Sequence, residues 1–121
     1  GSCGSAQEIY LMWQFAKTHK PESATERDIL AFMVEFLKWK KDFNGDPETE
    51  NEYVIAYGGR LFEVEDAFVN VVSDYVAIGA GMYFSTAALY LGQSPRAAVK
   101  VACDLNCFAS EPTVSYEMKT T

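Results

Sequence analysis

The pattern of helix and strand signals along these 121 residues predicts an α+β fold. Apolar residues recur at helical spacing through the first third of the chain, and β-branched and aromatic residues flank a Gly-Gly pair in the middle third. Two further helical segments follow, and the chain closes on a stretch of alternating polarity. The expected order is α-α-β-β-β-α-α-β, with helix pairs layered on an antiparallel sheet. We expect a single domain over residues 1–121.

The composition argues against several classes of function. Apolar content of 49% and charged content of 22% are typical of a folded globular protein. A net charge of −7 without a basic stripe argues against nucleic acid as a partner, and Lys38, Lys40 and Lys41 fit the charge bias of a helix C-terminus. No apolar run reaches the roughly 18 residues that span a bilayer, and the first residues do not resemble a signal peptide. Three cysteines without a paired framework indicate a reducing compartment, so we expect a cytoplasmic protein that does not bind membranes.

Two helices are expected in the first third. The opening GSCGS is typical of a strand end that turns into a helix, and Ser5 with Glu8 forms a capping-box pattern. A helix over residues 6–18 is predicted by apolar residues at helical spacing, namely Ile9, Met12, Trp13 and Ala16. His19 lies in the break that follows, as a solvated loop residue. Thr25 and Asp28 open the second helix, which runs to about Phe43 on one apolar face: Ile29, Phe32, Met33, Phe36 and Leu37.

Strands are expected next, after an acidic loop over residues 44–51. Residues 53–57 and 60–64 are rich in β-branched and aromatic side chains, and Gly58-Gly59 between them is a two-residue hairpin signal. Residues 66–73 are ambiguous between a short strand and a turn. Tyr75-Val76-Ala77-Ile78 has the length and residue types of a buried strand, which makes it the third predicted strand.

Two helices and one strand are expected to complete the fold. A helix over 82–91 ends at Gly92, and a second begins at Ser94 as N-cap with Pro95 at its first position and runs to about residue 106. The alternation over residues 113–118 predicts a last strand.

The Gly79-Ala80-Gly81 turn between strand and helix has two interpretations. A helix N-terminus attracts anions, so a phosphate cradle is one. The third glycine of a dinucleotide fingerprint and the Lys-Ser/Thr of a P-loop are both missing, so a packed strand-to-helix corner is favoured.

No metal or cofactor is predicted. Cys103 and Cys107 are four residues apart, but the one histidine, His19, lies far away in sequence. Both cysteines are read as small buried hydrophobes. The carboxylates of Glu63, Glu65 and Asp66 are read as a solvated strand edge and turn.

Three motifs resemble those of the proteasome β-subunit and HslV family of N-terminal nucleophile (Ntn) hydrolases. GSCGSAQ at residues 1–7 looks like the family's turn from a strand into its first helix. The hairpin VIAYGGRLFEVE (54–65) looks like its strand pair, and YVAIGAG (75–81) resembles its glycine-rich turn into the third helix. The order and spacing of the motifs fit over essentially the whole chain. The resemblance implies a partial αββα four-layer sandwich, covering the C-terminal two-thirds of the family fold.

The resemblance also implies candidate catalytic residues. In this family an N-terminal threonine attacks a peptide carbonyl with its own amine as base, and a backbone N–H binds the oxyanion. Gly1 falls near the oxyanion glycine, and Ser110 lies near a late loop that carries a supporting serine. Ala80 stands where many members have another serine. The simpler interpretation makes Gly1 a turn glycine, Ala80 a packing residue and Ser110 a loop hydroxyl. The strands that would carry the nucleophile, an aspartate and a lysine are not among these residues.

Two functions therefore compete. The first is a subunit of a threonine-type peptidase that cuts peptide substrates and is inactive as these 121 residues, because the nucleophile segment is absent. The second is a non-catalytic assembly protein with the same half-sandwich. Both imply self-association into a ring or an edge-paired oligomer, because unpaired strands expose backbone and apolar surface. An ATPase unfoldase is a possible partner of the peptidase.

Overall fold

The computed structural model describes residues 1–66 and 68–118. It divides the chain into two compact units, Gly1–Ser73 and residues 74–118, and each is described by itself. The predicted α+β class is confirmed by the elements of the two units. The prediction of a single domain stays a prediction.

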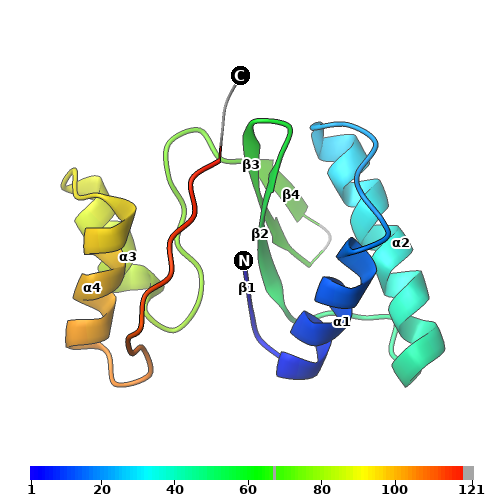
Figure 1. Cartoon of the computed structure of the whole chain (residues 1–121), viewed down its shortest axis with the longest axis horizontal. Coiled ribbons are helices and arrows are strands. Elements are labelled where there is room, and N and C mark those ends of the chain that lie inside the picture. The colour runs from blue at the N-terminus through cyan, green and yellow to red at the C-terminus, as the bar shows by residue number, and fades with distance from the viewer. Residues whose placement is uncertain (67, 119–121) are drawn as a thin grey trace. The chain divides into compact units, whose positions relative to one another are not determined.

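The first unit contains a four-stranded antiparallel sheet in the order β1-β2-β3-β4 (Figure 1). Its strands are β1 (Ser2–Cys3), β2 (Glu52–Tyr57), β3 (Arg60–Glu65) and β4 (Phe68–Val71). The Gly58-Gly59 hairpin forms as predicted: Tyr57 pairs with Arg60, and both glycines have positive φ. The opening GSCGS is also confirmed as a strand end, because Ser2 pairs with Tyr53 before the chain turns into a helix.

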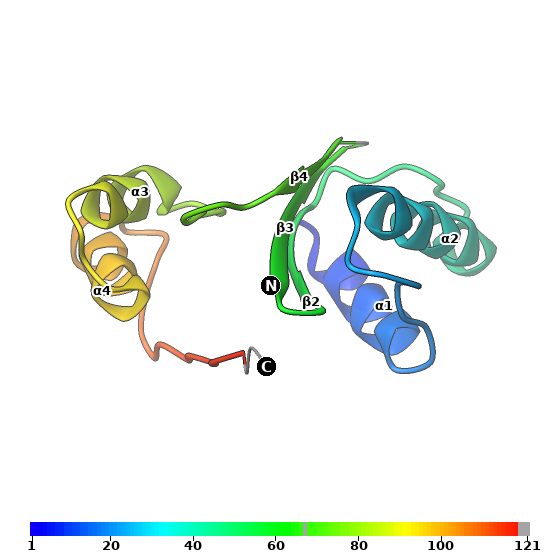
Figure 2. The ribbon, with the colours of Figure 1, turned by 90° about the horizontal axis from the view of Figure 1, so that it is seen from above.

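Two helices lie on the same face of this sheet (Figure 2). They are α1 (Ala6–Ala16) and α2 (Glu26–Asn44). Their predicted N-caps are confirmed, since Ser5 accepts a hydrogen bond from the backbone N–H of Glu8 and Thr25 from that of Asp28. Gly45 ends α2 in the left-handed conformation, at φ 75°.

The core of the first unit lies between the helices and the sheet. Tyr53, Phe62 and Val64 alternate on one sheet face and contact the apolar stripe of α2, as period-2 and helical spacing require. Side chains that are nearly or completely buried there belong to aromatic and branched residues: Phe15, Ile29, Phe32, Met33, Phe36, Tyr53, Phe62 and Val64.

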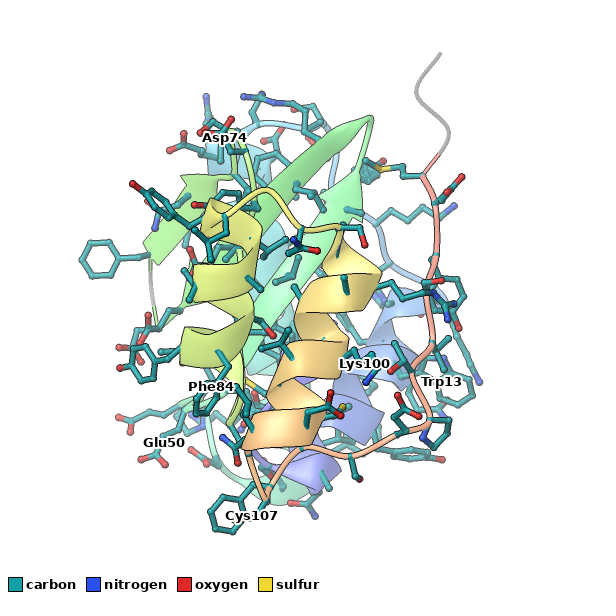
Figure 3. All side chains as sticks on the ribbon, turned by 90° about the vertical axis from the view of Figure 1, so that its left-hand side faces the viewer. Trp13, Glu50, Asp74, Phe84, Lys100 and Cys107 are labelled. Atoms are coloured by element: carbon teal, nitrogen blue, oxygen red, sulfur yellow. The ribbon has the colours of Figure 1, made fainter. Side chains whose placement is uncertain are left out.

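The second unit is a pair of helices, α3 (Met82–Tyr90) and α4 (Pro95–Leu105), followed by an extended segment (Figure 1). Ser94 caps α4 and Pro95 opens it, as predicted. The helices contact each other through small residues, and the buried hydroxyl of Ser85 donates to the carbonyl oxygen of Ala98 at 2.9 Å. Lys100 projects from α4, where its Nζ lies 2.7 Å from Asp104 Oδ2 (Figure 3).

Two predicted strands are wrong. Residues 75–78 and 113–118 form no strand, and neither pairs with another segment in the part of the chain that the structure describes. Alternating or apolar composition fits a strand, but a strand also needs a neighbour for its backbone hydrogen bonds. The strand that follows the Gly58-Gly59 hairpin is instead β4, which lies within the segment that the sequence left ambiguous. Over the described residues, no helix has the length and apolar character needed to cross a membrane.

Candidate functional site

Gly1, the first candidate catalytic residue, lies at the end of the β1–β2 ladder. Its nitrogen donates to the carbonyl oxygen of Val54 at 2.8 Å, and the N–H of Val54 donates back to Gly1 O at 2.8 Å. Gly1 is therefore fixed in position by two backbone hydrogen bonds.

The turn that follows Gly1 is held by Asn51, which the sequence did not single out. The side chain of Asn51 accepts from Ser5 N at 2.8 Å and donates to Ser5 O at 3.1 Å, and it is buried. Gly4 has φ +122°, and a Cβ at this position would lie 2.3 Å from Asn51 Oδ1. Both facts require glycine here. The Gly-x-x-Gly spacing was a visible signal for the turn, but its partner Asn51, 46 residues after Ser5, had none.

A buried polar cluster joins α1, α2 and β2 beside this turn. The Glu8 carboxylate accepts from the Tyr53 hydroxyl at 2.6 Å and from the Thr49 hydroxyl. The ammonium of Lys40 lies 3.5 Å from Glu8 Oε1 and 3.6 Å from Asp46 Oδ2. Burial and the adjacent Glu8 carboxylate raise the pKa of Tyr53, so its phenol stays protonated.

The charged ammonium of Lys40 is therefore buried inside the first unit. The residue is 1% exposed, and the carboxylates of Glu8 and Asp46 lie beside its ammonium. Glu8, Lys40 and Thr49 line a polar hollow of about 430 Å³. Since Tyr53, Thr49 and Lys40 all engage the carboxylate of Glu8, the arrangement connects three elements of the fold and leaves no free base.

Ser110, the second candidate, lies in the second unit and lines a hollow together with Ala80 and Gly81. Asn106 organises this hollow: its Nδ2 donates to Ala80 O at 2.8 Å, and its Oδ1 accepts from Phe108 N at 2.8 Å. The structure thus brings Ala80 and Ser110 to one place. Asn106 was missed, because a helix-end asparagine is common without any such role.

The corner at Gly79-Ala80-Gly81 is a packed one. A Cβ on Gly81 would lie 2.7 Å from the Cβ of Ala102, so the start of α3 lies directly against α4. This matches the favoured interpretation of the motif. Cys103 is half-buried and lines the same hollow, whereas Cys107 is exposed, so the prediction that both are buried is wrong for Cys107.

One acidic cluster lies on the sheet. Ligand oxygens of Glu52, Glu63 and Glu65 all lie within 4.8 Å of one another. Burial and the neighbouring charges of Glu65 and Glu63 raise the pKa of Glu52. Glu63 and Glu65 were expected at a solvated edge with Asp66, whereas Glu52 across the ladder is their partner. The cluster is a source of electrostatic repulsion.

Comparison with solved structures shows a proteasome-like fold. The chain is similar to Thiobacillus denitrificans BPH in complex with epoxomicin, with a TM-score of 0.77 and 20% sequence identity. The match covers 93% of this chain and 69% of that chain. The α+β arrangement is therefore consistent with a partial Ntn-type sandwich. No protein-family model and no curated protein matches the sequence.

Proposed function

We propose that this chain belongs to a subunit of a proteasome/HslV-like, threonine-type peptidase, which hydrolyses peptide bonds in the cytoplasm. The observation that carries the proposal is the proteasome-like fold over 93% of the chain, since the similar BPH structure holds epoxomicin. The fixed turn at Gly1 and the hollow that contains Ser110 support it from this chain's own residues.

In the proposal Gly1 supplies an oxyanion donor and Ser110 supports the catalytic amine. In the longer form Gly1 is an internal residue with one backbone N–H, and this donor would turn from Val54 O to the developing negative charge. Gly1 has no side chain that could attack a carbonyl. We therefore expect the 121 residues alone to be inactive, with the threonine nucleophile supplied by a longer form.

The second candidate is a non-catalytic assembly protein, and Ala80 favours it. A methyl group at this position cannot donate or accept the hydrogen bond that a serine would make. Exposed aromatic side chains on both units, such as Trp13 and Tyr83, favour self-association in either case. Ring assembly and an ATPase unfoldase partner belong to the peptidase proposal.

Native mass spectrometry of the protein from its natural source, with and without epoxomicin, separates the two candidates. The peptidase proposal expects retained epoxomicin on a chain with an N-terminal threonine, together with hydrolysis of a fluorogenic peptide. Assembly without epoxomicin retention or hydrolysis would overturn it in favour of the second candidate. In the active form, Ser110→Ala is expected to slow hydrolysis at least tenfold, whereas the matched control Ser115→Ala is not.

A further inference from the structure

Four polar residues form a closed ring of hydrogen bonds at the start of α1: Ser5, Glu8, Thr49 and Asn51. The Ser5 hydroxyl accepts from Glu8 N at 3.4 Å, and the Glu8 carboxylate accepts from the Thr49 hydroxyl. The oxygen of that hydroxyl accepts from Asn51 N at 3.1 Å. The Asn51 side chain closes the ring, because it accepts from Ser5 N at 2.8 Å and donates to Ser5 O at 3.1 Å. The ring therefore fastens the turn at Ser5 to the segment that precedes β2.

The ring is buried and has little freedom to rearrange. Glu8 is 6% exposed and Asn51 is 3% exposed. The Tyr53 hydroxyl, 2.6 Å from Glu8 Oε2, and the Lys40 ammonium, 3.5 Å from Glu8 Oε1, also engage the carboxylate. A buried polar network in which the members are all bonded favours one conformation. The ring therefore holds the turn in a single geometry.

Asn51 has the most demanding position in this ring. Ser5 presents one backbone donor and one backbone acceptor to the same side chain, and an amide end group satisfies both at once. An ionised aspartate has the same shape but only accepts, so it would leave Ser5 O without its donor. Gly4 lies against the same side chain, since a Cβ there would be 2.3 Å from Asn51 Oδ1. Asn51 thus determines the path of the backbone over Gly4 and Ser5.

The ring is also one of two anchors of the short strand β1. At one end Gly1 and Val54 exchange backbone hydrogen bonds, and at the other end the chain reaches Ser5 and the ring. The proposed function requires the Gly1 N–H to turn from Val54 O toward a developing negative charge. That movement weakens the first anchor, so the position of β1 then depends more strongly on the second.

We propose that Asn51 is a positioning residue for peptide hydrolysis. Through Ser5 it fixes the turn, and through β1 it fixes the place from which the Gly1 N–H donates to the oxyanion. The inference rests on the proposed function, because no oxyanion forms without hydrolysis. An error of about 1 Å in the placement of a catalytic group can cost about 100-fold in rate. The loss should appear in kcat and not in KM, because the oxyanion exists only in the transition state.

Steady-state hydrolysis of a fluorogenic peptide, by the native form with the N-terminal threonine, tests this role. Asn51→Asp should lower kcat at least tenfold at pH 8 and leave KM within about twofold of wild type. Relative to wild type, the loss should shrink as the pH falls toward 5, because burial favours a protonated carboxyl group, which again donates to Ser5 O. The matched control Asn44→Asp, at an exposed site where a carboxylate keeps the acceptor for Asp46 N, should match wild type at both pH values.

A second pair of variants breaks the ring at Thr49 and covers the case in which Asn51→Asp does not fold. Thr49→Val removes the hydroxyl and should also lower kcat, whereas Thr49→Ser keeps the hydroxyl and should retain the wild-type kcat. Wild-type kcat in folded Asn51→Asp and Thr49→Val, or a loss in Asn51→Asp that does not change with pH, would overturn the positioning role and leave the proposed function standing. Absence of hydrolysis by the wild-type native form would overturn the proposed function, and this inference with it.

Discussion

The two units of the chain bury different kinds of side chain. The first unit encloses a cluster of large residues, with Phe36 and Phe62 at 0% exposure. In the second unit the buried apolar side chains among the described residues are those of three alanines, Ala88, Ala98 and Ala102. Each large side chain buried from water contributes roughly 1.5–3 kcal/mol, and an alanine contributes far less. We infer that the first unit is stabilised by its own core and the second mainly by close helix contact.

The second unit also exposes large aromatic and aliphatic side chains, the kind that form the core of the first unit. Tyr83, Tyr90 and Leu91 are each more than 70% exposed, as are Phe108 and Tyr116. Large apolar side chains gathered on one unit mark a surface that another layer covers. We infer that the second unit depends on cover more than the first, whose large core side chains are already enclosed.

The largest effect on stability is expected from the removal of a buried aromatic side chain in the first unit. Phe36→Ala should lower the free energy of unfolding by about 3–5 kcal/mol, because it leaves a cavity among Phe15, Trp39 and Tyr53. Both tryptophans, Trp13 and Trp39, lie in this unit, so tryptophan fluorescence during urea unfolding reports on it. The matched control Tyr90→Ala, at a 79% exposed site, should change the free energy of unfolding by no more than about 0.5 kcal/mol.

Gly81→Ala should affect the second unit and spare the first. The new methyl would lie 2.7 Å from Ala102 Cβ, and forcing the helices apart should cost about 1–3 kcal/mol. Helical circular dichroism should fall at lower urea, while the tryptophan transition stays in place. Ala102→Gly removes the clash, so the double variant should be more stable than the sum of the single changes predicts. Strict additivity would contradict the contact.

Tyr53→Phe tests the buried polar cluster of the first unit. Removing the hydroxyl leaves the Glu8 carboxylate with one donor fewer, at a cost of about 1–3 kcal/mol. The pKa of Tyr53 is raised in the folded state, so its stabilising contribution is complete below pH 10 and is lost as the pH rises further. Wild type and Tyr53→Phe should therefore converge in stability above pH 10. Tyr10→Phe, at an exposed site, is the control and should behave as wild type throughout.

The smallest expected effect is a gain in the free energy of unfolding. Glu52→Gln removes one of three mutually repelling carboxylates and should raise stability at pH 7 by about 0.5 kcal/mol. Because the pKa of Glu52 is raised on folding, its protonated form is favoured, and wild type regains that stability as the pH falls through the folded pKa. The advantage of the variant should disappear by pH 3 in thermal unfolding experiments. An advantage that persists there would mean that charge is not its cause.

The same contrast explains what could be predicted from the sequence. In the first unit, local signals and tertiary structure agree: Ser5 and Thr25 cap helices, Gly58-Gly59 turns the hairpin, and Phe36 lies on the predicted apolar face. In the second unit, residues 75–78 and 113–118 have strand composition but no strand opposite them in the described part of the chain. Composition reports what a segment prefers, and pairing decides what it forms.

The candidate sites follow the same rule. The positions of Gly1, Ala80 and Ser110 came from motifs, and the structure brings Ala80 and Ser110 to one hollow. Asn51 and Asn106, which hold the two turns, could not be found in this way, because each acts on a residue 26 to 46 positions away in the sequence. Pairing between distant polar groups has no periodic signal.

Amide hydrogen exchange, resolved by residue, tests most directly whether the two units differ in stability. Exchange protection follows the free energy of local opening, so a unit with its own core should exchange more slowly than one without. We expect amides of α2, β2 and β3 to exchange at least about 100-fold more slowly than those of α3 and α4, as a difference of some 2.7 kcal/mol implies. Equal protection across both units would contradict the account, because it would show that α3 and α4 unfold only together with the core of the first unit.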